Sequence, residues 1–349
     1  MSNKLSNKLN VIIDPHFRKV DSIFSPADKE RLYNLVDVVW GKDDPMPLDL
    51  ATEALTQADA VVCANWRYGE ALYHAPNLRA IMAVSGGFPL GFDYDYCFDK
   101  RIRVSTSAPA FGRQVAEMAL GMALAAGREI ALGDRAMRAG NETYKWQGCE
   151  NMFMLFDKPV GFIGYGGLAN ALHPLLKPFG CKISAYDPWV SQGYLRRQGV
   201  DPVSLETLLE TSKVIFVLAV PSSENRAMLS REQLERIQPD AALILMSRAH
   251  VVDFDALTDL LLAGCFRAAI DVFPQEPLDP NHPIRTAENA ILSAHRAGSV
   301  PEGLYEIGEM VVDDLEALNL GVPPRRLQLA QPELMSRYES NKVKPYKNS

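Results

Sequence analysis

The sequence VGFIGYGGLANALHPLLKPFGCKISAYDP, residues 160–188, decides the fold of this chain. An apolar run enters a glycine-rich turn with Gly164, Gly166 and Ala169 in the pattern G-x-G-x-x-A, and leucines then recur at helical spacing. A second apolar run ends at Asp187, 23 residues after Gly164. We interpret the stretch as strand, tight turn, helix and second strand.

This order of elements is typical of a dinucleotide-binding unit. Gly164 would close the turn, and Gly166 would let a pyrophosphate approach the backbone. The N–H groups of Gly167 and Leu168 would face the phosphates at a helix N-terminus. Asp187 would accept the ribose hydroxyls and repel a 2′-phosphate, which predicts NAD as the cofactor. An ordinary strand-to-helix turn could carry the same glycines, but the flanking elements and the carboxylate favour the cofactor.

Composition narrows the class of protein. A chain of 349 residues suggests two domains, and a net charge of −7 with both signs mixed argues against nucleic acid as a partner. The five cysteines are scattered and odd in number, which predicts reduced thiols rather than disulfides or a zinc site, and the six histidines suggest no metal cluster. No signal peptide and no membrane-spanning stretch is apparent, so we expect a cytoplasmic protein without a membrane partner.

Strand-like and helix-like segments alternate along the chain, which predicts an α/β fold with parallel sheets covered on both faces. In the first part we expect strands at 10–13, 36–40, 60–64, 80–84 and 102–105, and helices at 49–56 and 67–73. A mostly apolar helix follows at 112–130. We then expect six strands, at 160–163, 182–186, 214–220, 242–246, 268–272 and 290–292, and a long helix at 300–320. Pro174 should shorten or kink the helix after the glycine turn.

Two segments of the first part could bind a ligand, because ligands of such sheets lie beyond the carboxyl ends of the strands. In the segment Ser85, Gly86 and Gly87, the backbone could bind an anion or could simply form a flexible turn. Arg67 follows another strand, as a substrate contact or as an ordinary surface arginine. The polar C-terminal end, 339–349, is expected to be mobile.

Three polar residues follow strands of the second part: Arg248, Glu276 and His295. Each alone has an ordinary structural explanation. Together, beside a cofactor, they supply what carbonyl reduction needs, because hydride transfer develops negative charge on the carbonyl oxygen. His295 can donate a proton, Glu276 can hold the imidazolium, and Arg248 can bind a carboxylate bidentately.

These residues lie in motifs that resemble those of the D-isomer-specific 2-hydroxyacid dehydrogenases. The motifs are VGFIGYGGLA with YDP at 186–188, SRAHVVD at 247–253, AAIDVFPQEPL at 268–278 and SAHRAG at 293–298. They occur in the family's order, and the resemblance covers about residues 10 to 333. The chain departs from the family at Ala249 and His250, at Ala294, and in the loop SGGFPLGFD at 85–93.

The resemblance implies two Rossmann-like or flavodoxin-like domains, with an NAD-binding domain, 109–298, inserted into a substrate-binding domain made of 1–108 plus 299–349. It implies hydride transfer between NAD(H) and a small 2-keto or 2-hydroxy acid, with Arg248, Glu276 and His295 as catalytic residues. The activity could be like that of a glyoxylate/hydroxypyruvate reductase. The resemblance also implies a homodimer built on the cofactor domains. The expected cofactor contacts are Gly164, Gly166, Gly167, Leu168, Asp187, Pro188, Val220, Pro221, Met246, Ser247, Arg248, Asp271, His295 and Gly298. The expected substrate contacts are Arg67, Ser85, Gly86, Gly87 and Arg248.

Two alternatives remain open from the sequence. Within the family, the chain could act on a non-hydroxyacid anion such as phosphite; formate is less favoured, because the formate enzymes carry glutamine where this chain has Glu276. A protein of another class, a dinucleotide-sensing corepressor-like binding protein, has a similar fold and retains comparable residues. Consumption of NADH with a panel of 2-keto acids would separate an enzyme from such a sensor.

Overall fold

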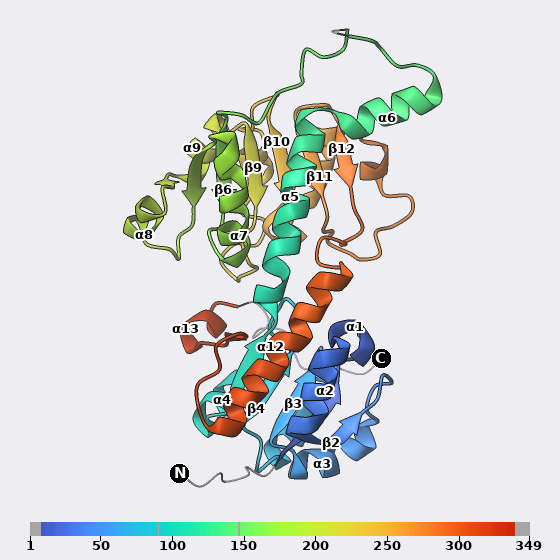
Figure 1. Cartoon of the computed structure of the whole chain (residues 1–349). Coiled ribbons are helices and arrows are strands. Elements are labelled where there is room, and N and C mark those ends of the chain that lie inside the picture. The colour runs from blue at the N-terminus through green and yellow to red at the C-terminus, as the bar shows by residue number, and fades with distance from the viewer. Residues whose placement is uncertain (1–7, 90, 146, 339–349) are drawn as a thin grey trace. The chain divides into compact units, whose positions relative to one another are not determined.

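The computed structural model describes residues 8–89, 91–145 and 147–338, so the polar end expected to be mobile lies outside the described residues. The chain divides into two compact units, which are described separately below (Figure 1). Unit 1 comprises Met1–Phe111 and Ser299–Ser349, and unit 2 comprises Gly112–Gly298. No helix within the described ranges is both long enough and apolar enough to cross a membrane.

Unit 1 contains a six-stranded sheet in the order β13-β5-β4-β3-β1-β2. The five strands from β1 to β5 are parallel, and their order 2-1-3-4-5 is that of flavodoxin-like sheets. The sixth strand, β13, pairs antiparallel with β5. The strands are β1 (Leu9–Asp14), β2 (Val36–Gly41), β3 (Ala60–Cys63), β4 (Ala80–Ala83), β5 (Arg103–Thr106) and β13 (Gln328–Leu329).

Helices cover both faces of this sheet. Because side chains alternate along a strand, Val11 and Ile13 of β1 pack with Ile307 and Val311 of α12, whereas Ile12 belongs to a second core cluster. The helices are α1 (Val20–Ile23), α2 (Pro26–Leu35), α3 (Leu48–Gln57), α4 (Tyr94–Lys100), α12 (Pro301–Leu320) and α13 (Pro332–Met335). Two 3₁₀ turns, η1 (Gly69–His74) and η2 (Ala108–Phe111), complete the unit.

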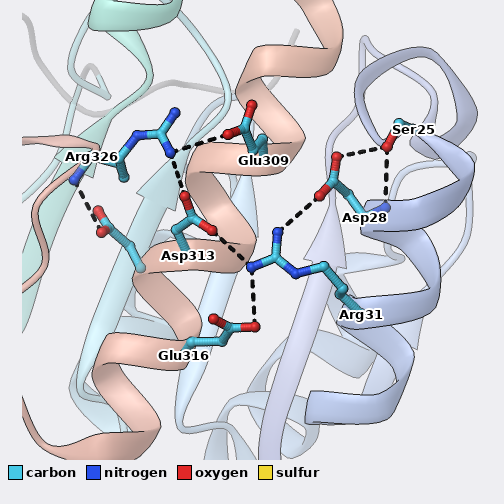
Figure 2. A network of polar contacts seen from close by, with 8 residues as sticks. Ser25, Asp28, Arg31, Glu309, Asp313, Glu316 and Arg326 are labelled. Atoms are coloured by element: carbon cyan, nitrogen blue, oxygen red, sulfur yellow. Dashed lines mark hydrogen bonds and ion pairs between the residues drawn. The ribbon is translucent and has the colours of Figure 1, made fainter.

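An ion-pair network joins α2 to α12 (Figure 2). Arg31 of α2 donates to Asp28 at 3.0 Å, to Asp313 at 2.8 Å and to Glu316 at 3.1 Å. Arg326 contacts the same Asp313 from the segment after α12. The network therefore ties the last part of the chain to its first helices, over a separation of 282 residues between Arg31 and Asp313.

Unit 2 contains a parallel seven-stranded sheet in the order β12-β11-β10-β9-β6-β7-β8. Its first six strands in chain order follow the dinucleotide-binding arrangement 3-2-1-4-5-6. The strands are β6 (Pro159–Ile163), β7 (Lys182–Tyr186), β8 (Asp201–Pro202), β9 (Val214–Val217), β10 (Ala242–Leu245), β11 (Arg267–Ile270) and β12 (Ala290–Leu292). The predicted α/β class with Rossmann-like sheets is confirmed.

Helices also cover both faces of the unit 2 sheet. One core cluster joins β9 and β10 to α9 and α11, while α5 packs against α7 and against β10 and β11. The helices are α5 (Gly112–Gly127), α6 (Ile130–Ala139), α7 (Gly167–Leu176), α8 (Gln192–Arg197), α9 (Leu205–Thr211), α10 (Arg231–Leu234) and α11 (Phe254–Leu262). The 3₁₀ turns are η3 (Lys177–Phe179), η4 (Ala249–Val251) and η5 (Pro283–Thr286).

Some predicted elements were wrong in kind or extent. The helix expected at 67–73 is the 3₁₀ turn η1. The helix expected at 112–130 ends at Gly127, and α6 begins after Glu129, whose φ of 52° is left-handed and interrupts the helix. The two-residue strands β8 and β13 were not predicted, because neither carries an apolar run. Helix α7 is short, as expected: it ends at Leu176, two residues after Pro174, and η3 follows directly.

Candidate active site

The glycine turn after β6 has the geometry that a dinucleotide requires. Gly164 has a φ of 90°, and a Cβ placed there would lie 2.6 Å from the Cα of Ala219, so only glycine fits. By contrast, a Cβ at Gly166 or Gly167 would meet no atom within 4 Å. The N–H groups of Gly167 and Leu168 open α7 and find no acceptor in the described part of the chain. The turn therefore offers open space in front of free donors, which fits a pyrophosphate.

Asp187 lies directly after β7 and is held from two sides. Its Oδ2 accepts a hydrogen bond from the N–H of Tyr165 at 2.7 Å, and its Oδ1 accepts one from the N–H of Trp189 at 2.8 Å. It forms no ion pair with any residue that the structure describes. The carboxylate is thus fixed in place and keeps lone pairs for the hydroxyls of a ribose.

A buried pair beneath the turn was not predicted from the sequence. The hydroxyl of Tyr165 lies 2.8 Å from Nδ1 of His173 on α7. Burial lowers the pKa of His173, and Lys177 lowers it further. Burial also raises the pKa of Tyr165. The neutral forms of both side chains are therefore favoured, which suits a hydrogen bond between them.

Arg248, Asp271 and His295 follow three neighbouring parallel strands of unit 2. Arg248 comes three residues after β10, Asp271 directly after β11, and His295 three residues after β12. Their positions are at the carboxyl edge of the sheet, where ligands of α/β sheets bind. Arg248 is exposed, and its Nη1 donates to the carbonyl oxygen of Ser247 at 2.7 Å. No interaction among the described residues joins Arg248 to Glu276 or His295.

Glu276 and His295 form a hydrogen-bonded dyad. Nδ1 of His295 lies 2.6 Å from Oε2 of Glu276, and Oε1 of Glu276 accepts from the N–H of Phe273 at 3.0 Å. The side chain of His295 is 42% exposed and that of Glu276 is 37% exposed, so reactants can reach the imidazole. The carboxylate is oriented by the backbone, and in turn orients the ring.

Asp271 holds the backbone around His295. Its buried carboxylate accepts from the N–H of Arg296 at 2.9 Å and from that of Ala297 at 3.1 Å, while its carbonyl accepts from the N–H of His295 at 2.8 Å. His295 has a φ of 52°, a left-handed conformation that costs free energy for a residue with a Cβ. Asp271 therefore fixes the strained turn that presents the imidazole, a positioning role that the sequence analysis missed.

The remaining predicted cofactor contacts lie around the same edge. Val220 and Pro188 are exposed, Pro221 and Gly298 are half-buried, and Met246 and Ser247 are buried. His250, one of the departures from the family pattern, lies with Nε2 3.0 Å from the carbonyl oxygen of Ser222. This contact joins the segments that follow β9 and β10.

The carboxyl edge of the unit 1 sheet holds the other predicted residues. The carbonyls of Ser85 and Gly87 accept from the hydroxyl of Thr106, at 2.6 and 3.0 Å. The N–H groups of Ser85, Gly86 and Gly87 have no acceptor within the described ranges, as an anion-binding backbone would require. Arg67 donates from Nη2 to Oδ2 of the buried Asp14 at 2.6 Å, so its charge is paired.

The described residues do not form a metal site. Among the described residues, no three side chains of the His, Cys, Asp or Glu types come together as a metal site would need. All five cysteines are free, and burial raises the pKa of Cys63 to about 12, so this thiol is not a nucleophile at neutral pH.

Comparison with known proteins identifies the family. Residues 120–297 match the family model described as the D-isomer specific 2-hydroxyacid dehydrogenase NAD-binding domain. The chain is 30% identical over 294 residues to the glyoxylate reductase of Korarchaeum cryptofilum, covering 82% of this chain and 87% of that protein. This chain belongs to the D-isomer specific 2-hydroxyacid dehydrogenase family. The family predicted from the motifs is therefore confirmed.

Further relatives in the family agree. The crystal structure of a phosphoglycerate oxidoreductase from Rhizobium etli superimposes with a TM-score of 0.83 at 33% identity, covering 94% of this chain and 99% of that one. The D-3-phosphoglycerate dehydrogenase of Archaeoglobus fulgidus is 29% identical over 258 residues, which are 73% of this chain and 48% of that protein. As a member of this family the chain is an NAD-dependent 2-hydroxyacid dehydrogenase, and its cofactor is NAD(H).

Proposed function

We propose that this enzyme reduces the carbonyl group of a small 2-keto acid to a hydroxyl group, or catalyses the reverse oxidation, with His295 as the acid/base. The observation that carries the proposal is the distance of 2.6 Å between Nδ1 of His295 and Oε2 of Glu276. Glyoxylate, named in several relatives, and hydroxypyruvate are the first substrates to test.

The dyad determines which nitrogen reacts. Because Nδ1 of His295 is engaged by Glu276, Nε2 is the nitrogen that gives a proton to the carbonyl oxygen in reduction and takes one from the hydroxyl in oxidation. Glu276 stabilises the imidazolium that stands ready for reduction. NADH, when bound, supplies the hydride, so the proton and the hydride together account for the two hydrogens added.

Three groups are proposed to contact the substrate. Arg248 binds its carboxylate and polarises its carbonyl with a planar pair of donors. The free N–H groups of Ser85, Gly86 and Gly87, in unit 1, bind an acidic group of the substrate. Arg67 is a further substrate contact, and the buried Asp14 holds its side chain in one orientation.

The two units are proposed to divide the work. Unit 2, which contains the stretch matched by the NAD-binding family model, holds the cofactor and contributes Arg248, and unit 1 contributes the other proposed substrate contacts. The turn from Gly164 to Leu168 contacts the pyrophosphate, and Asp187 with Pro188 contacts the ribose. The remaining cofactor contacts come from the strand-end residues Val220, Pro221, Met246, Ser247, Arg248, Asp271, His295 and Gly298.

The test of the reaction uses purified enzyme, with NADH for glyoxylate, hydroxypyruvate and pyruvate, and with NAD⁺ for phosphite. Absorbance of NADH should fall with at least one keto acid, and His295→Gln should lower kcat by about 10²-fold or more. Reduction of NAD⁺ by phosphite, without turnover of any keto acid, would overturn the proposed substrate class. Turnover that survives in His295→Gln would overturn the assignment of the dyad.

We also propose that the enzyme is a cytoplasmic homodimer formed through unit 2. No residue of α6 is buried, and Ile130 and Met137 are 59% and 58% exposed. A hollow of about 480 Å³ adjoins α6. Its lining includes Leu132, Arg135, Leu261, Leu262, Ala287 and Ile291. An amphipathic helix with exposed apolar residues beside a partly apolar hollow matches what a second copy of the same surface would cover.

Light scattering after size-exclusion chromatography tests the dimer. Met137→Asp should yield monomers, because a charge would be buried at the interface. Leu320→Asp is the matched control, since Leu320 is 74% exposed at the end of α12 in unit 1. A wild-type monomer at micromolar concentration would contradict the proposal.

A further inference from the structure

Two arginines follow neighbouring strands at the carboxyl edge of the unit 1 sheet, and only one has its charge paired. Arg67, after β3, donates to Asp14, whose side chain is fully buried. Arg18 follows β1 by four residues and forms no ion pair with any carboxylate in the described chain. Burial lowers the pKa of Arg18, and no carboxylate opposes this effect. Guanidinium stays charged in proteins, so Arg18 carries an uncompensated positive charge.

The side chain of Arg18 is nevertheless held in one place. Its Nε donates to the carbonyl oxygen of Val84 at 3.0 Å. Its guanidinium carbon lies 5.2 Å from the ring centroid of Phe17 and 5.7 Å from that of Phe111. These contacts orient the guanidinium plane, while its Nη atoms donate to no residue that the structure describes. The two Nη groups are therefore available to an external acceptor.

The orientation places Arg18 beside the loop proposed to bind the substrate. Val84, its acceptor, directly precedes Ser85, and the ring of Phe111 lies against Gly86, where a Cβ would come within 3.3 Å of it. Arg18, Phe111 and the loop are thus one packed assembly within unit 1. Free N–H groups and a free guanidinium meet there, and both kinds of donor bind anions.

The charges indicate which anion Arg18 binds. The reacting end of a 2-keto acid brings a single negative charge, which the proposed function assigns to Arg248. Arg18 offers a second guanidinium without a carboxylate partner among the described residues, and such a group is suited to a second negative charge. We infer that Arg18 is a specificity-determining residue that binds a second acidic group of the substrate, a carboxylate or a phosphate. This inference rests on the proposed function and narrows its substrate class to 2-keto acids that carry a second acid.

Paired substrates test the inference with the full-length enzyme and NADH. One pair is 2-oxoglutarate and 2-oxopentanoate, which differ in a distal carboxylate, and the other is 3-phosphohydroxypyruvate and hydroxypyruvate, which differ in a phosphate. The wild-type enzyme should prefer the acidic member of at least one pair in kcat/KM, and that pair identifies the acid. Arg18→Met should lower kcat/KM for that member by about 10- to 100-fold, the range of charge-assisted hydrogen bonds. The kcat/KM for the member without the second acid should change by less than about threefold.

The control is Lys19→Met, which removes the same charge from an exposed neighbouring residue and should leave the preference unchanged. If Arg18→Met is unstable, Arg18→Lys keeps the charge but loses the planar fork, and should reduce the preference by about 3- to 10-fold. Equal losses for both members of each pair, or a preference that survives in both Arg18 variants, overturn the inference.

A binding measurement separates failure of the inference from failure of the proposed function. If the wild-type enzyme reduces no keto acid of the panel, the proposed function fails. The role of Arg18 can still be tested by comparing the increase in Tm caused by succinate with that caused by butyrate. Succinate should raise Tm more than butyrate in the wild-type enzyme and in Lys19→Met, but not in Arg18→Met. Equal effects of the two acids on the wild-type enzyme overturn the role of Arg18.

Discussion

The hydroxyl oxygen of Tyr165 lies 2.8 Å from Nδ1 of His173, and both side chains are buried beneath the nucleotide turn. The N–H of the same tyrosine donates to Asp187, the carboxylate proposed to hold the ribose. The His173 ring therefore supports, through one residue, the position of the acidic group at the end of β7. The pair acts by positioning, since both side chains are largely buried.

Replacing His173 should change how stability depends on pH. The pKa of His173 is lowered in the folded protein, whereas in the unfolded chain it is about 6.5. The stability due to its neutral form is thus fully present above pH ~6.5 and is lost as pH falls through the lower, folded pKa. His173→Phe should abolish that loss, and should cost about 1–3 kcal/mol at pH 7.5 because the Tyr165 hydroxyl loses its partner.

Urea unfolding at pH 7.5 and at pH 5.5 measures both effects. His74→Phe, at an exposed position of η1, is the control and should keep the pH dependence of the wild-type protein. If the unfolding free energy falls by the same amount between pH 7.5 and pH 5.5 in the wild-type protein and in His173→Phe, His173 does not contribute to the loss of stability in acid.

Asp187 should determine the choice of cofactor. The wild-type enzyme should prefer NADH over NADPH by roughly 10²-fold in kcat/KM, because a 2′-phosphate would be placed against a fixed carboxylate. Asp187→Ser should lower kcat/KM for NADH and so reduce the ratio of kcat/KM for NADH to that for NADPH. Asp201→Ser, an exposed carboxylate in the neighbouring strand β8, should leave the ratio unchanged. Comparable kcat/KM values for the two cofactors in the wild-type enzyme would contradict this prediction.

Glu276→Gln should slow the reduction of a keto acid. The amide can still accept from Phe273, but it removes the negative charge beside the imidazolium of His295. We expect kcat to fall by about 10- to 100-fold while the KM for NADH changes little. A deuterium isotope effect from labelled NADH shows whether hydride transfer limits the rate. An unchanged kcat under that condition would show that Glu276 is not part of the dyad.

Asp271→Asn should disturb the same histidine through the backbone. An amide offers one acceptor and one donor to two N–H groups, so the turn that holds His295 in its left-handed conformation should loosen. We expect a loss of about 1–3 kcal/mol in unfolding free energy and at least a ~10-fold lower kcat. Asp279→Asn is a suitable control, because Asp279 accepts from the N–H of Asn281 in an exposed loop. Equal effects of the two substitutions on kcat would contradict a positioning role for Asp271.

The sequence predicted what depends on local pattern. The turn from Gly164 to Ala169 was predictable, because its pattern of small residues is typical of one kind of strand-to-helix turn. Apolar runs identified most strands. Strand ends were placed one to three residues too late at several positions, because the apolar pattern continues into residues such as Met246, which leaves the sheet but remains buried.

The features of the site that the sequence did not predict depend on contacts between residues far apart in the chain. The hydrogen bond between Glu276 and His295 was predictable as a chemical need, but the support from Asp271 depends on the fold of the turn after β12. Likewise, nothing in the local sequence of Arg18 separates it from Arg67. Only the buried position of Asp14 shows which arginine has a partner.

The contacts between Arg31 and the carboxylates of α12 have a consequence for folding during synthesis on the ribosome. Synthesis delivers residues 9–110 long before Ile307, Val311 and Leu315, which complete one face of their core. Unit 2 emerges in between as an uninterrupted segment. Domains generally fold as units during synthesis, so unit 2 should mature while the first segment waits with an uncovered apolar face. Until translation reaches α12, that face is a target for chaperones, and ribosome-bound chains stalled before residue 300 should be the most sensitive to protease.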